Sequence, residues 1–329
     1  MEIEKDIKCI FVSWEKHTRS RSIARALDIS IFEVIYDNRF FIRYICSALK
    51  TLCILRRERP DIVIFQNPSI VLAVFLVVYS FFVKLDLVMD AHNAAINPLE
   101  GRFWVLNKLS ALLIAKVNLT IVTNELLVAA VKENNGRAFV LEDPIPKFVI
   151  SECVKKSKGD FKKVVFVCSW AKDEPYMEVI EAARSLSSKD IVLFVTGNPP
   201  KHVMKHLIPD NLKLTGYLLE QDYVDLLAES NLIVDLTDRS DCLVCGGYEA
   251  AAVGTPCILS DNLCSSQTFS MGYLYSNNDS NSLKESIIYG VENEDRLRSD
   301  IERFRSEYEG KYDRKLESLK FLINSIVGV

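Results

Sequence analysis

The stretch DIVIFQNPSIVLAVFLVVYSFFVKLDLVMD, residues 61–90, decides the fold class. It begins with the apolar run 61–66, continues after Pro68 with an apolar segment that reaches Val83, and ends with a second short apolar run, 85–90. Two short apolar runs on either side of a longer one predict a strand, a helix and a second strand. This unit is typical of a parallel sheet that is covered by helices.

The same alternation continues on both sides of this stretch. Strands are expected at residues 8–12 and 31–35, and the second of them precedes a helix at 40–59 whose apolar positions recur about every 3.6 residues until Pro60 ends it. The remaining elements of the first half are helices at 21–27, 104–116 and 125–134 and strands at 119–123 and 139–141. The first half is therefore predicted to be a doubly wound parallel sheet.

A break in the pattern predicts a domain boundary. Asp143-Pro144-Ile145-Pro146 interrupts the alternation, and the Lys- and Ser-rich stretch 155–160 is typical of a linker. The alternation then restarts with strands at 164–168, 191–196, 212–214, 232–236 and 256–259 and helices at 176–185, 221–228 and 247–252. The predicted fold is α/β, with two Rossmann-like doubly wound domains, 1–150 and 151–310, and a cleft between them. The tail 295–329 is helical in pattern, and its last part, 311–329, is expected to cross back to the first domain.

Composition excludes several classes of protein. With 329 residues, 49% hydrophobic and 26% charged, the chain can bury a large core, so it is neither disordered nor held together by disulfides. The net charge of −4 is too acidic for a general nucleic-acid binder, and no nucleic-acid partner is expected. The first 150 residues hold 19 basic and 16 acidic side chains, whereas the rest hold 21 and 28, so the two halves differ in charge.

Cysteine usage and the N-terminal residues favour a cytoplasmic protein. The nine cysteines are an odd number, and the acidic start MEIEKD is not followed by an apolar signal region. The longest apolar run, 70–83, would measure about 21 Å as a helix, which is short of a hydrocarbon core of roughly 30 Å. We therefore expect no segment here to span a membrane alone.

The stretch SDCLVCGGYEAAAVGTP, residues 240–256, carries the most specific chemical pattern. Gly246 and Gly247 at a predicted helix start let a ligand approach the backbone, and the helix N-terminus suits a diphosphate. Glu249 would repel phosphate, but its carboxylate can accept hydrogen bonds from ribose hydroxyls. The alternative is an ordinary capped helix with a solvated glutamate.

This stretch resembles the donor-site signature of retaining GT-B glycosyltransferases, the group that includes glycogen and sucrose synthases and many bacterial polysaccharide transferases. The spacing Asp241-x7-Glu249 matches its two acidic positions, and residues 254–258 match its small-Pro-apolar strand entry. Residues 214–217 and 230–234 resemble two further strands of the family, and residues 88–92 resemble its strand that ends in a histidine, here His92.

The resemblance implies a nucleoside-diphosphate sugar as donor, most simply a UDP-sugar, bound mainly by the second domain. Glu249 would bind the ribose, Asp241 the hydroxyls of the transferred sugar, and His92 the sugar or diphosphate. His92 and Asp241 are thus the predicted catalytic residues. The predicted donor-binding residues are Glu249, Gly246, Gly247, Tyr248, Arg239, Lys172, Ser169 and Gly197. Members of this family retain the anomeric configuration of the donor sugar, in what is usually described as a front-side reaction. The resemblance implies no cofactor or metal, because cationic side chains and helix N–H groups can offset the negative charge of the leaving diphosphate.

Two positions depart from the family pattern. Asp241 is one methylene shorter than the usual glutamate, and the arginine that commonly follows the first strand of the second domain is absent from residues 168–175. We assign Lys172 and Arg239 as the substitutes that offset the phosphate charge.

The loop after the first strand, residues 13–22, is a candidate acceptor site. Where the family often has a glycine-rich turn, this chain has His17, Arg19 and Arg21, and guanidinium groups bind phosphate or carboxylate bidentately. The alternative is a solvated helix start.

The first half also carries a candidate membrane surface. Arg43, Lys50 and Arg57 recur every seven residues beside an apolar stripe, and basic amphipathic helices favour anionic lipid surfaces. Together with the apolar run 70–83, this predicts docking on the inner membrane leaflet, where lipid-linked glycan acceptors reside. A buried helix with solvated basic residues is the alternative.

A zinc site is the weaker interpretation of Cys242-x2-Cys245 with Cys257 and Cys264, because Cys257 lies in a predicted buried strand and four-ligand closure is strained. The predicted function is transfer of a sugar from a nucleoside-diphosphate sugar to a polysaccharide or lipid-linked glycan. The alternatives are a nucleotide-sugar epimerase of the same fold and a non-catalytic scaffold that binds a nucleotide sugar.

Overall fold

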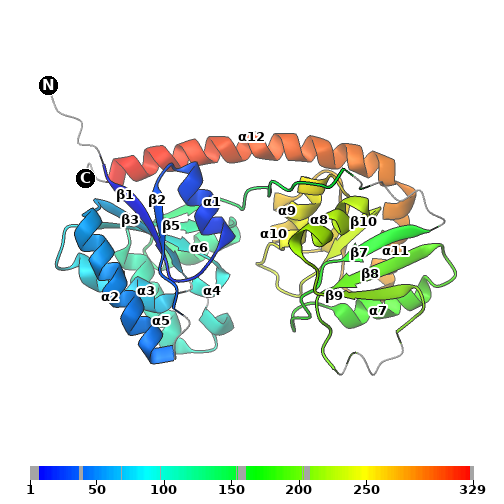
Figure 1. The fold of residues 1–329 in the computed structure, drawn as a ribbon, viewed down its shortest axis with the longest axis horizontal. Helices are drawn as coiled ribbons and strands as arrows, with labels where there is room; N and C mark the ends of the chain where they lie inside the picture. The colour runs from blue at the N-terminus through cyan, green and yellow to red at the C-terminus, as the bar shows by residue number, and fades with distance from the viewer. Residues whose placement is uncertain are drawn as a thin grey trace. The chain divides into compact units, whose positions relative to one another are not determined.

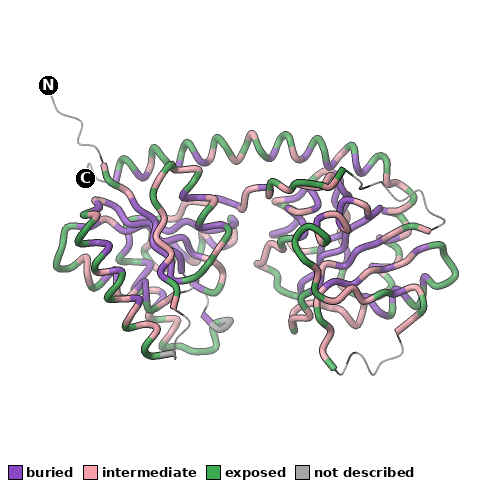
Figure 2. Tube along the Cα trace, in the orientation of Figure 1, coloured by how far each residue is buried: buried purple, intermediate pink, exposed green. Residues whose placement is uncertain are grey.

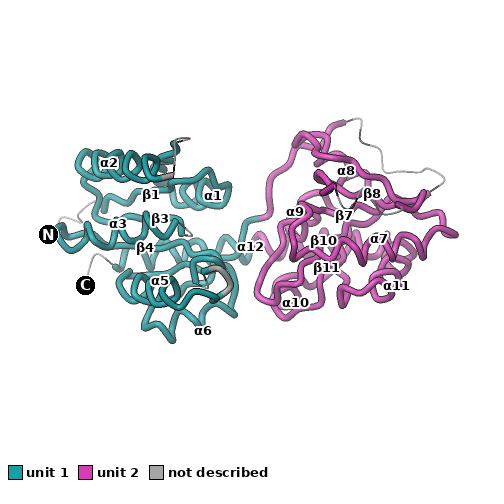
Figure 3. Tube along the Cα trace, turned by 90° about the horizontal axis from the view of Figure 1, so that it is seen from below, with its two compact units in different colours: residues 1–144, 311–329 teal, residues 145–310 magenta. Residues whose placement is uncertain are grey.

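The chain forms two compact units, seen in a computed structural model (Figure 3). The structure describes residues 7–36, 40–67, 69–96, 98–152, 154, 161–201, 203 and 208–326. Unit 1 comprises Met1–Pro144 and Lys311–Val329, and unit 2 comprises Ile145–Gly310. The division thus falls at Pro144, whereas the sequence predicts it after residue 150, and the expected linker at 155–160 lies outside the described residues.

Unit 1 is a six-stranded parallel sheet with the strand order β2-β1-β3-β4-β5-β6 (Figure 1). Its strands are β1 Cys9–Ser13, β2 Ser30–Glu33, β3 Ile62–Asn67, β4 Asp86–Ala91, β5 Leu119–Val122 and β6 Ala138–Val140. Its helices are α1 Thr18–Ala26, α2 Phe40–Glu58, α3 Ile70–Ser80, α4 Asn93–Ile96, α5 Trp104–Lys116 and α6 Leu126–Glu133, with a 3₁₀ turn at Pro98–Gly101. The central strands β3 and β4 are buried, except for Asp86 at the start of β4, because helices cover both faces of the sheet, as in other parallel sheets.

Alternate strand residues separate the core of unit 1 into two layers. Ile10 and Val12 of β1 point to the layer under α2, α3 and α5, whereas Phe11 between them points to the layer under α1. The second layer is completed by Leu316, Leu319 and Ile323 of α12, Glu294–Ile326. The C-terminal helix therefore supplies part of the core of unit 1, and the tube in Figure 2 shows its buried positions recurring along one side.

Truncating Leu319 should destabilise unit 1. Its side chain is fully buried against the sheet, so Leu319→Ala is expected to lower the free energy of unfolding by about 2–5 kcal/mol. Phe321→Ala on the same helix is the control, because Phe321 is 79% exposed and should change stability by less than about 1 kcal/mol. Urea denaturation measures both, and equal losses would contradict this packing of the helix.

Unit 2 repeats the architecture with the strand order β12-β11-β10-β7-β8-β9, all parallel. Its strands are β7 Lys162–Phe166, β8 Ile191–Thr196, β9 Leu212–Gly216, β10 Leu232–Asp235, β11 Cys257–Ser260 and β12 Tyr273–Ser276. Its helices are α7 Tyr176–Ser185, α8 Glu220–Glu229, α9 Cys245–Val253, α10 Leu263–Thr268 and α11 Ser280–Glu292, followed by the first part of α12. Two Rossmann-like units of this kind confirm the predicted fold class.

The apolar helix α3 is a sheet-covering element. It spans Ile70–Ser80, and its buried side chains pack on the core of unit 1. Within the described residues, no helix is both long enough and apolar enough to cross a bilayer.

Candidate functional site

Residues predicted to bind the donor gather at one edge of the unit 2 sheet. The strands β10, β7 and β8 are neighbours and run parallel, so the loops that follow them emerge at the same edge. Ser169 and Lys172 follow β7, Gly197 follows β8, and Arg239 and Asp241 follow β10. Helix α9 begins after this last loop and packs on β10. Ligands of open parallel sheets bind at this edge.

Glu249 has a defined position in the second turn of α9. Its Oε2 accepts a hydrogen bond from the phenol of Tyr223 on α8 at 2.5 Å, and the carboxylate is only partly exposed. Burial raises the pKa of Glu249, and the hydrogen bond from Tyr223 partly opposes this. The same pairing and burial raise the pKa of Tyr223, so the phenol stays protonated and donates. Tyr223 leaves the other carboxylate oxygen of Glu249 for a further donor, such as a ribose hydroxyl.

The two glycines at the start of α9 are explained by packing within unit 2. The N–H of Gly246 donates to Oδ2 of Asp235 at 2.7 Å, and a Cβ at this position would lie 2.5 Å from the same oxygen. A Cβ at Gly247 would lie 2.6 Å from the ring of Phe269. The structure therefore corrects the prediction that these glycines admit a ligand to the backbone, because Asp235 and Phe269 already occupy the space.

Asp235 anchors the helix start from within the core. It ends β10, it is buried, and burial raises the pKa of its carboxyl group well above the usual range, against the effect of the Gly246 N–H. The residue thus ties the first turn of α9, which follows the loop that carries Asp241, to the sheet.

Tyr248 is a core residue, which corrects its assignment to donor binding. Its ring is 4% exposed and packs edge-on against Phe269, with 4.9 Å between ring centroids, and against Tyr308. It follows Gly247 on the helix, and the face of α9 that carries it turns toward the aromatic side chains of α12.

The loop after β7 binds a carboxylate of its own chain. Glu174 accepts hydrogen bonds from the hydroxyl of Ser169 at 2.7 Å and from the N–H groups of Ser169 and Ala171. The prediction that Ser169 contacts the donor is corrected here, since its amide and hydroxyl both bind Glu174. Gly197, with φ +76°, lies against this loop, where a Cβ would meet the carbonyl oxygen of Cys168 at 2.4 Å. Glycine is required at this position because the backbone of the neighbouring loop lies too close for a side chain.

The two substitute cations lie on adjoining loops. Asp173 accepts a hydrogen bond from the hydroxyl of Thr237 and pairs with Nε of Arg239 at 3.2 Å, which joins the loops after β7 and β10. Half of the Arg239 side chain remains exposed, and Lys172 is exposed beside it. Lys172 also lines a cavity of about 400 Å³ together with Glu174, Glu178 and Asp238. Both cations are therefore accessible to an anionic ligand.

Asp241 lies partly exposed on the loop between β10 and α9, next to Cys242. Burial raises the pKa of the Cys242 thiol, and Cys257 is fully buried in β11. Among the described residues, no group of three or more His, Cys, Asp or Glu side chains is arranged to hold a metal ion.

Unit 1 brings together two histidines that the sequence assigns separately. His17 precedes α1 and His92 follows β4, and their ring centroids lie 4.7 Å apart at the carboxyl ends of the strands. Nδ1 of His17 and Nε2 of His92 are buried and have no hydrogen-bond partner among the described residues. Burial lowers the pKa of His92, and Asp90 opposes this effect while Arg19 and His17 add to it. His92 is therefore a neutral imidazole near pH 7.

Arg19 is a structural residue, which corrects its assignment to acceptor binding. The guanidinium is buried and donates to Asp90 at 3.0 Å, to Asp143 at 2.7 Å and to the carbonyl oxygen of Leu141 at 2.7 Å. Burial opposes the charge of Arg19, but Asp90 and Asp143 outweigh it and hold its pKa above the ordinary value. The network ties α1 to β4 and to the end of unit 1.

Arg21 is also engaged within unit 1. It forms a bidentate pair with Glu33 of β2, at 2.9 and 2.7 Å, on the surface. Of the three predicted acceptor-binding residues, only His17 has a buried side-chain polar atom without a hydrogen-bond partner in the described part of the chain.

Sequence reasoning missed three side chains that shape these edges. Asp90 is the last residue but one of a buried strand and Asp235 is the last residue of another, and an acidic residue at such a place is visible in the sequence. Tyr223 gave no such signal, because it lies 26 residues before Glu249 on another helix.

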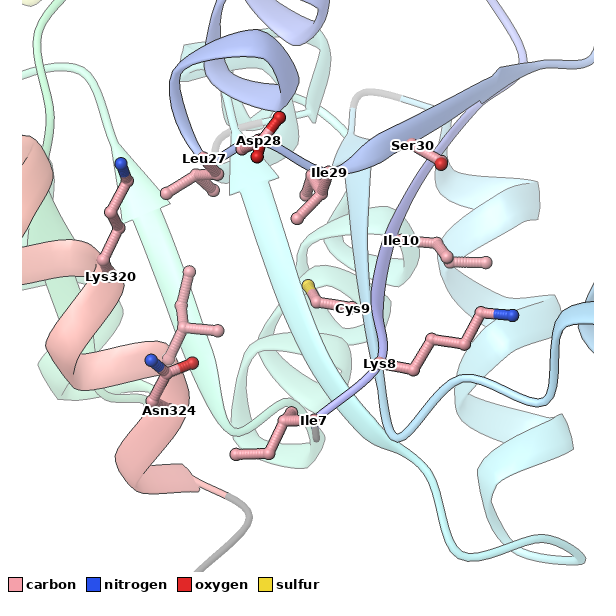
Figure 4. A pocket seen from close by; sticks show the side chains of 11 residues that line it. Ile7, Lys8, Cys9, Ile10, Leu27, Asp28, Ile29, Ser30, Lys320 and Asn324 are labelled. Carbon is pink, nitrogen blue, oxygen red and sulfur yellow. The ribbon is translucent and has the colours of Figure 1, made fainter. Parts of the chain in front are cut away.

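A further cavity lies at the opposite, amino edge of the unit 1 sheet. It has a volume of about 590 Å³ and is bounded by the start of β1, the turn after α1 and the end of α12. Figure 4 shows Lys8, Asp28, Lys320 and Asn324 around it. None of the predicted site residues lines this cavity.

One family model matches most of unit 2. Residues 152–306, a little under half of the chain, match the family model of glycosyl transferases group 1. A search of curated proteins gives no match.

Several solved structures share the whole fold. HepE of Anabaena in complex with UDP has a TM-score of 0.71 and 12% identity, covering 98% of this chain and 100% of that one. Sucrose-phosphate synthase of Thermosynechococcus elongatus has a TM-score of 0.77 and 10% identity, covering 98% and 99%. A candidate UDP-N-acetylglucosamine 2-epimerase of Listeria monocytogenes has a TM-score of 0.62 and 13% identity, covering 94% of each chain.

At these identities the structural likeness shows the fold alone, and the glycosyltransferase family match covers residues 152–306 of unit 2. Together they show that the chain is a glycosyltransferase with the GT-B fold.

Proposed function

We propose that the protein transfers a sugar from a nucleoside-diphosphate sugar, with UDP as the nucleotide, to a polysaccharide or lipid-linked glycan acceptor with retention of configuration. The observation that carries this proposal is the glycosyltransferase match over residues 152–306. The matched unit presents Glu249, Asp241 and two accessible cations at one edge of its sheet. The structurally similar HepE was solved with UDP and with UDP-glucose, which supports the choice of nucleotide.

Each of the accessible side chains has a proposed role. Glu249, oriented by Tyr223, accepts hydrogen bonds from the ribose hydroxyls, and Asp241 holds the hydroxyls of the transferred sugar. Lys172 and Arg239 offset the negative charge that grows on the leaving diphosphate, so the reaction needs no metal or other cofactor. His92, neutral near pH 7, contacts the sugar or the diphosphate, and His17 beside it faces the acceptor.

The proposed place of action is the cytoplasmic face of a membrane, where a lipid-linked acceptor is found. No disulfide joins the described cysteines, which fits a reducing compartment.

The reaction itself is tested by following the products with NMR. The protein is incubated with a UDP-sugar and a glycan acceptor in the presence of EDTA, and we expect free UDP and a new glycoside in equal amounts, with the anomeric configuration of the donor. Asp241→Asn should lower the rate at least tenfold, because one charged contact to the sugar is lost. An inverted product would refute retention. An isomerised sugar nucleotide formed without acceptor would indicate an epimerase, and donor binding without any turnover would indicate a scaffold.

A further inference from the structure

Exposed apolar side chains of the protein are concentrated on three helices of unit 1. Of the 21 exposed large apolar residues in the described chain, 13 lie on α2, α3 and α5 or in the residues that directly flank them. We call these 13 residues the helix-face patch. They are Phe41, Ile42, Ile45 and Leu49 at α2, Val71, Val78, Phe81, Phe82 and Val83 at α3, and Phe103, Trp104, Val105 and Leu112 at α5.

The three helices form one continuous layer. Helix α3 packs against α2 on one side and against α5 on the other, and all three cover the same face of the sheet (Figures 1 and 3). The patch includes the most exposed aromatic side chains of unit 1 other than Phe321, such as Phe82 at 82% and Trp104 at 68%. Monomeric soluble proteins rarely expose so many neighbouring large apolar side chains unless the surface binds something.

Along α2, the apolar stripe runs beside a basic row. Ile42, Ile45 and Leu49 form the outer stripe, since they recur at helical spacing and all are more than half exposed. Arg43, Lys50 and Arg57 recur every seven residues and lie one position further around the helix. The helix therefore has the amphipathic form of an interfacial helix, with its buried side against the sheet.

The charge of the layer is strongly one-sided. Together α2, α3 and α5 contain six Lys or Arg residues and one acidic residue, Glu58, which is paired with Lys8 and Arg57. The whole chain has a net charge of −4, so the positive charge is a local property of this layer. Lys108 of α5 lies 4.9 Å from the centre of the Trp104 ring and adds a basic group beside the largest exposed aromatic side chain.

We propose that the helix-face patch docks on an anionic lipid membrane, with its apolar side chains entering the headgroup region and its basic residues binding lipid phosphates. Exposed Trp and Phe next to Lys and Arg are the combination that such interfaces select. A second copy of the chain fits less well, because a symmetric dimer through this face would bring two basic layers together. This inference rests on the proposed function in one respect, namely that the acceptor is lipid-linked.

The position of the patch suits an enzyme that takes its acceptor from a membrane. Helices α2 and α5 begin on the side where the strands end, so Phe41, Ile42 and Trp104 in their first turns lie toward the same edge as His17 and His92. Docking through these turns would present that edge of unit 1 to the headgroup layer.

Vesicle flotation tests the proposal with the full-length protein. We expect the wild type to float with vesicles of phosphatidylcholine and phosphatidylglycerol and to remain behind with phosphatidylcholine alone, and added salt should weaken the binding. Lys50→Glu/Arg57→Glu should lower the partition coefficient at least about tenfold, and Ile45→Ser/Trp104→Ser should lower it similarly. The matched control is Lys189→Glu/Lys311→Glu, which makes the same change in net charge at exposed positions outside the layer and should bind as the wild type does.

Two outcomes would overturn the proposal. One is a wild type that does not bind anionic vesicles. The other is a concentration-dependent dimer in sedimentation velocity that Ile45→Ser/Trp104→Ser converts to a monomer, because a second copy would then cover the patch. UDP affinity, measured for the same variants, should stay unchanged and shows that they are folded. If the wild type floats with the vesicles and binds no nucleotide, the proposed function fails while the docking surface stands.

Discussion

Replacing Arg19 with Ala should lower the free energy of unfolding of unit 1 by about 3–5 kcal/mol. Arg19 is the cation that neutralises Asp90, a carboxylate with no exposed surface, and the substitution leaves this charge in the core without its partner. The change also removes the hydrogen bonds to Asp143 and to the carbonyl oxygen of Leu141. Urea denaturation followed by tryptophan fluorescence, to which the buried Trp14 of the same unit contributes, measures the loss.

Arg21→Ala is the control for this substitution. Arg21 lies on the same helix and also pairs with a carboxylate, but its side chain is about half exposed, so its loss should destabilise unit 1 far less than the loss of Arg19 does. Equal effects of the two substitutions would contradict a structural role that is special to Arg19. A stable Arg19→Ala protein with impaired saturation by the acceptor would restore the acceptor-binding role that the sequence predicts.

Glu249→Gln should weaken UDP binding by about 10- to 100-fold. A carboxylate accepts stronger hydrogen bonds from hydroxyl groups than an amide does, and hydrogen bonds to charged groups contribute about 1.5–3 kcal/mol. Titration calorimetry with UDP measures the ratio of the dissociation constants. Glu220→Gln is the matched control, because Glu220 is exposed at the start of α8 and should leave the affinity unchanged.

The pH dependence of UDP binding provides a second test of Glu249. Its pKa is raised by burial, so its carboxylate takes up a proton at a higher pH than an ordinary glutamate does. The affinity of the wild type should therefore fall as the pH drops toward this raised pKa, and Glu249→Gln should lose the dependence. If Glu249→Gln bound UDP as tightly as the wild type does, Glu249 would not contact the nucleotide, and the Asp241-x7-Glu249 spacing would be a coincidence.

The fold could be predicted because hydrophobic patterning is a local property of the chain. The strands expected at 61–66 and 85–90 are found at Ile62–Asn67 and Asp86–Ala91, and the helix expected between them is α3. The strand Tyr273–Ser276, which pairs with β11 at the edge of the sheet, was not predicted. Helices α10 and α11 were missed in the same region.

The site could be predicted only as far as its position in the fold. Parallel strands fix which loops share an edge, and this placed Lys172, Arg239 and Asp241 together. Arg19 was misassigned because its partners Asp90 and Asp143 are 71 and 124 residues away, and a sequence pattern does not reveal such pairing. Tyr248 was misassigned because its neighbour Tyr308 comes from the distant helix α12.

The sequence predicted only part of the helix-face patch. The basic row of α2 could be read from its seven-residue spacing, but α3 was expected to contribute its whole apolar run, and much of that run is buried. The contribution of α5 through Phe103, Trp104 and Val105 depends on the packing of α3 between α2 and α5, which only the structure provides.

Calorimetric titration of the wild-type protein with UDP, GDP, ADP and CMP tests the central claim most directly. If unit 2 holds the nucleotide of a sugar donor, one diphosphate, and on our account UDP, should bind with a clear preference over the other three. If none of the four binds at millimolar concentrations, the assignment of Glu249, Asp241, Lys172 and Arg239 to a donor site is contradicted.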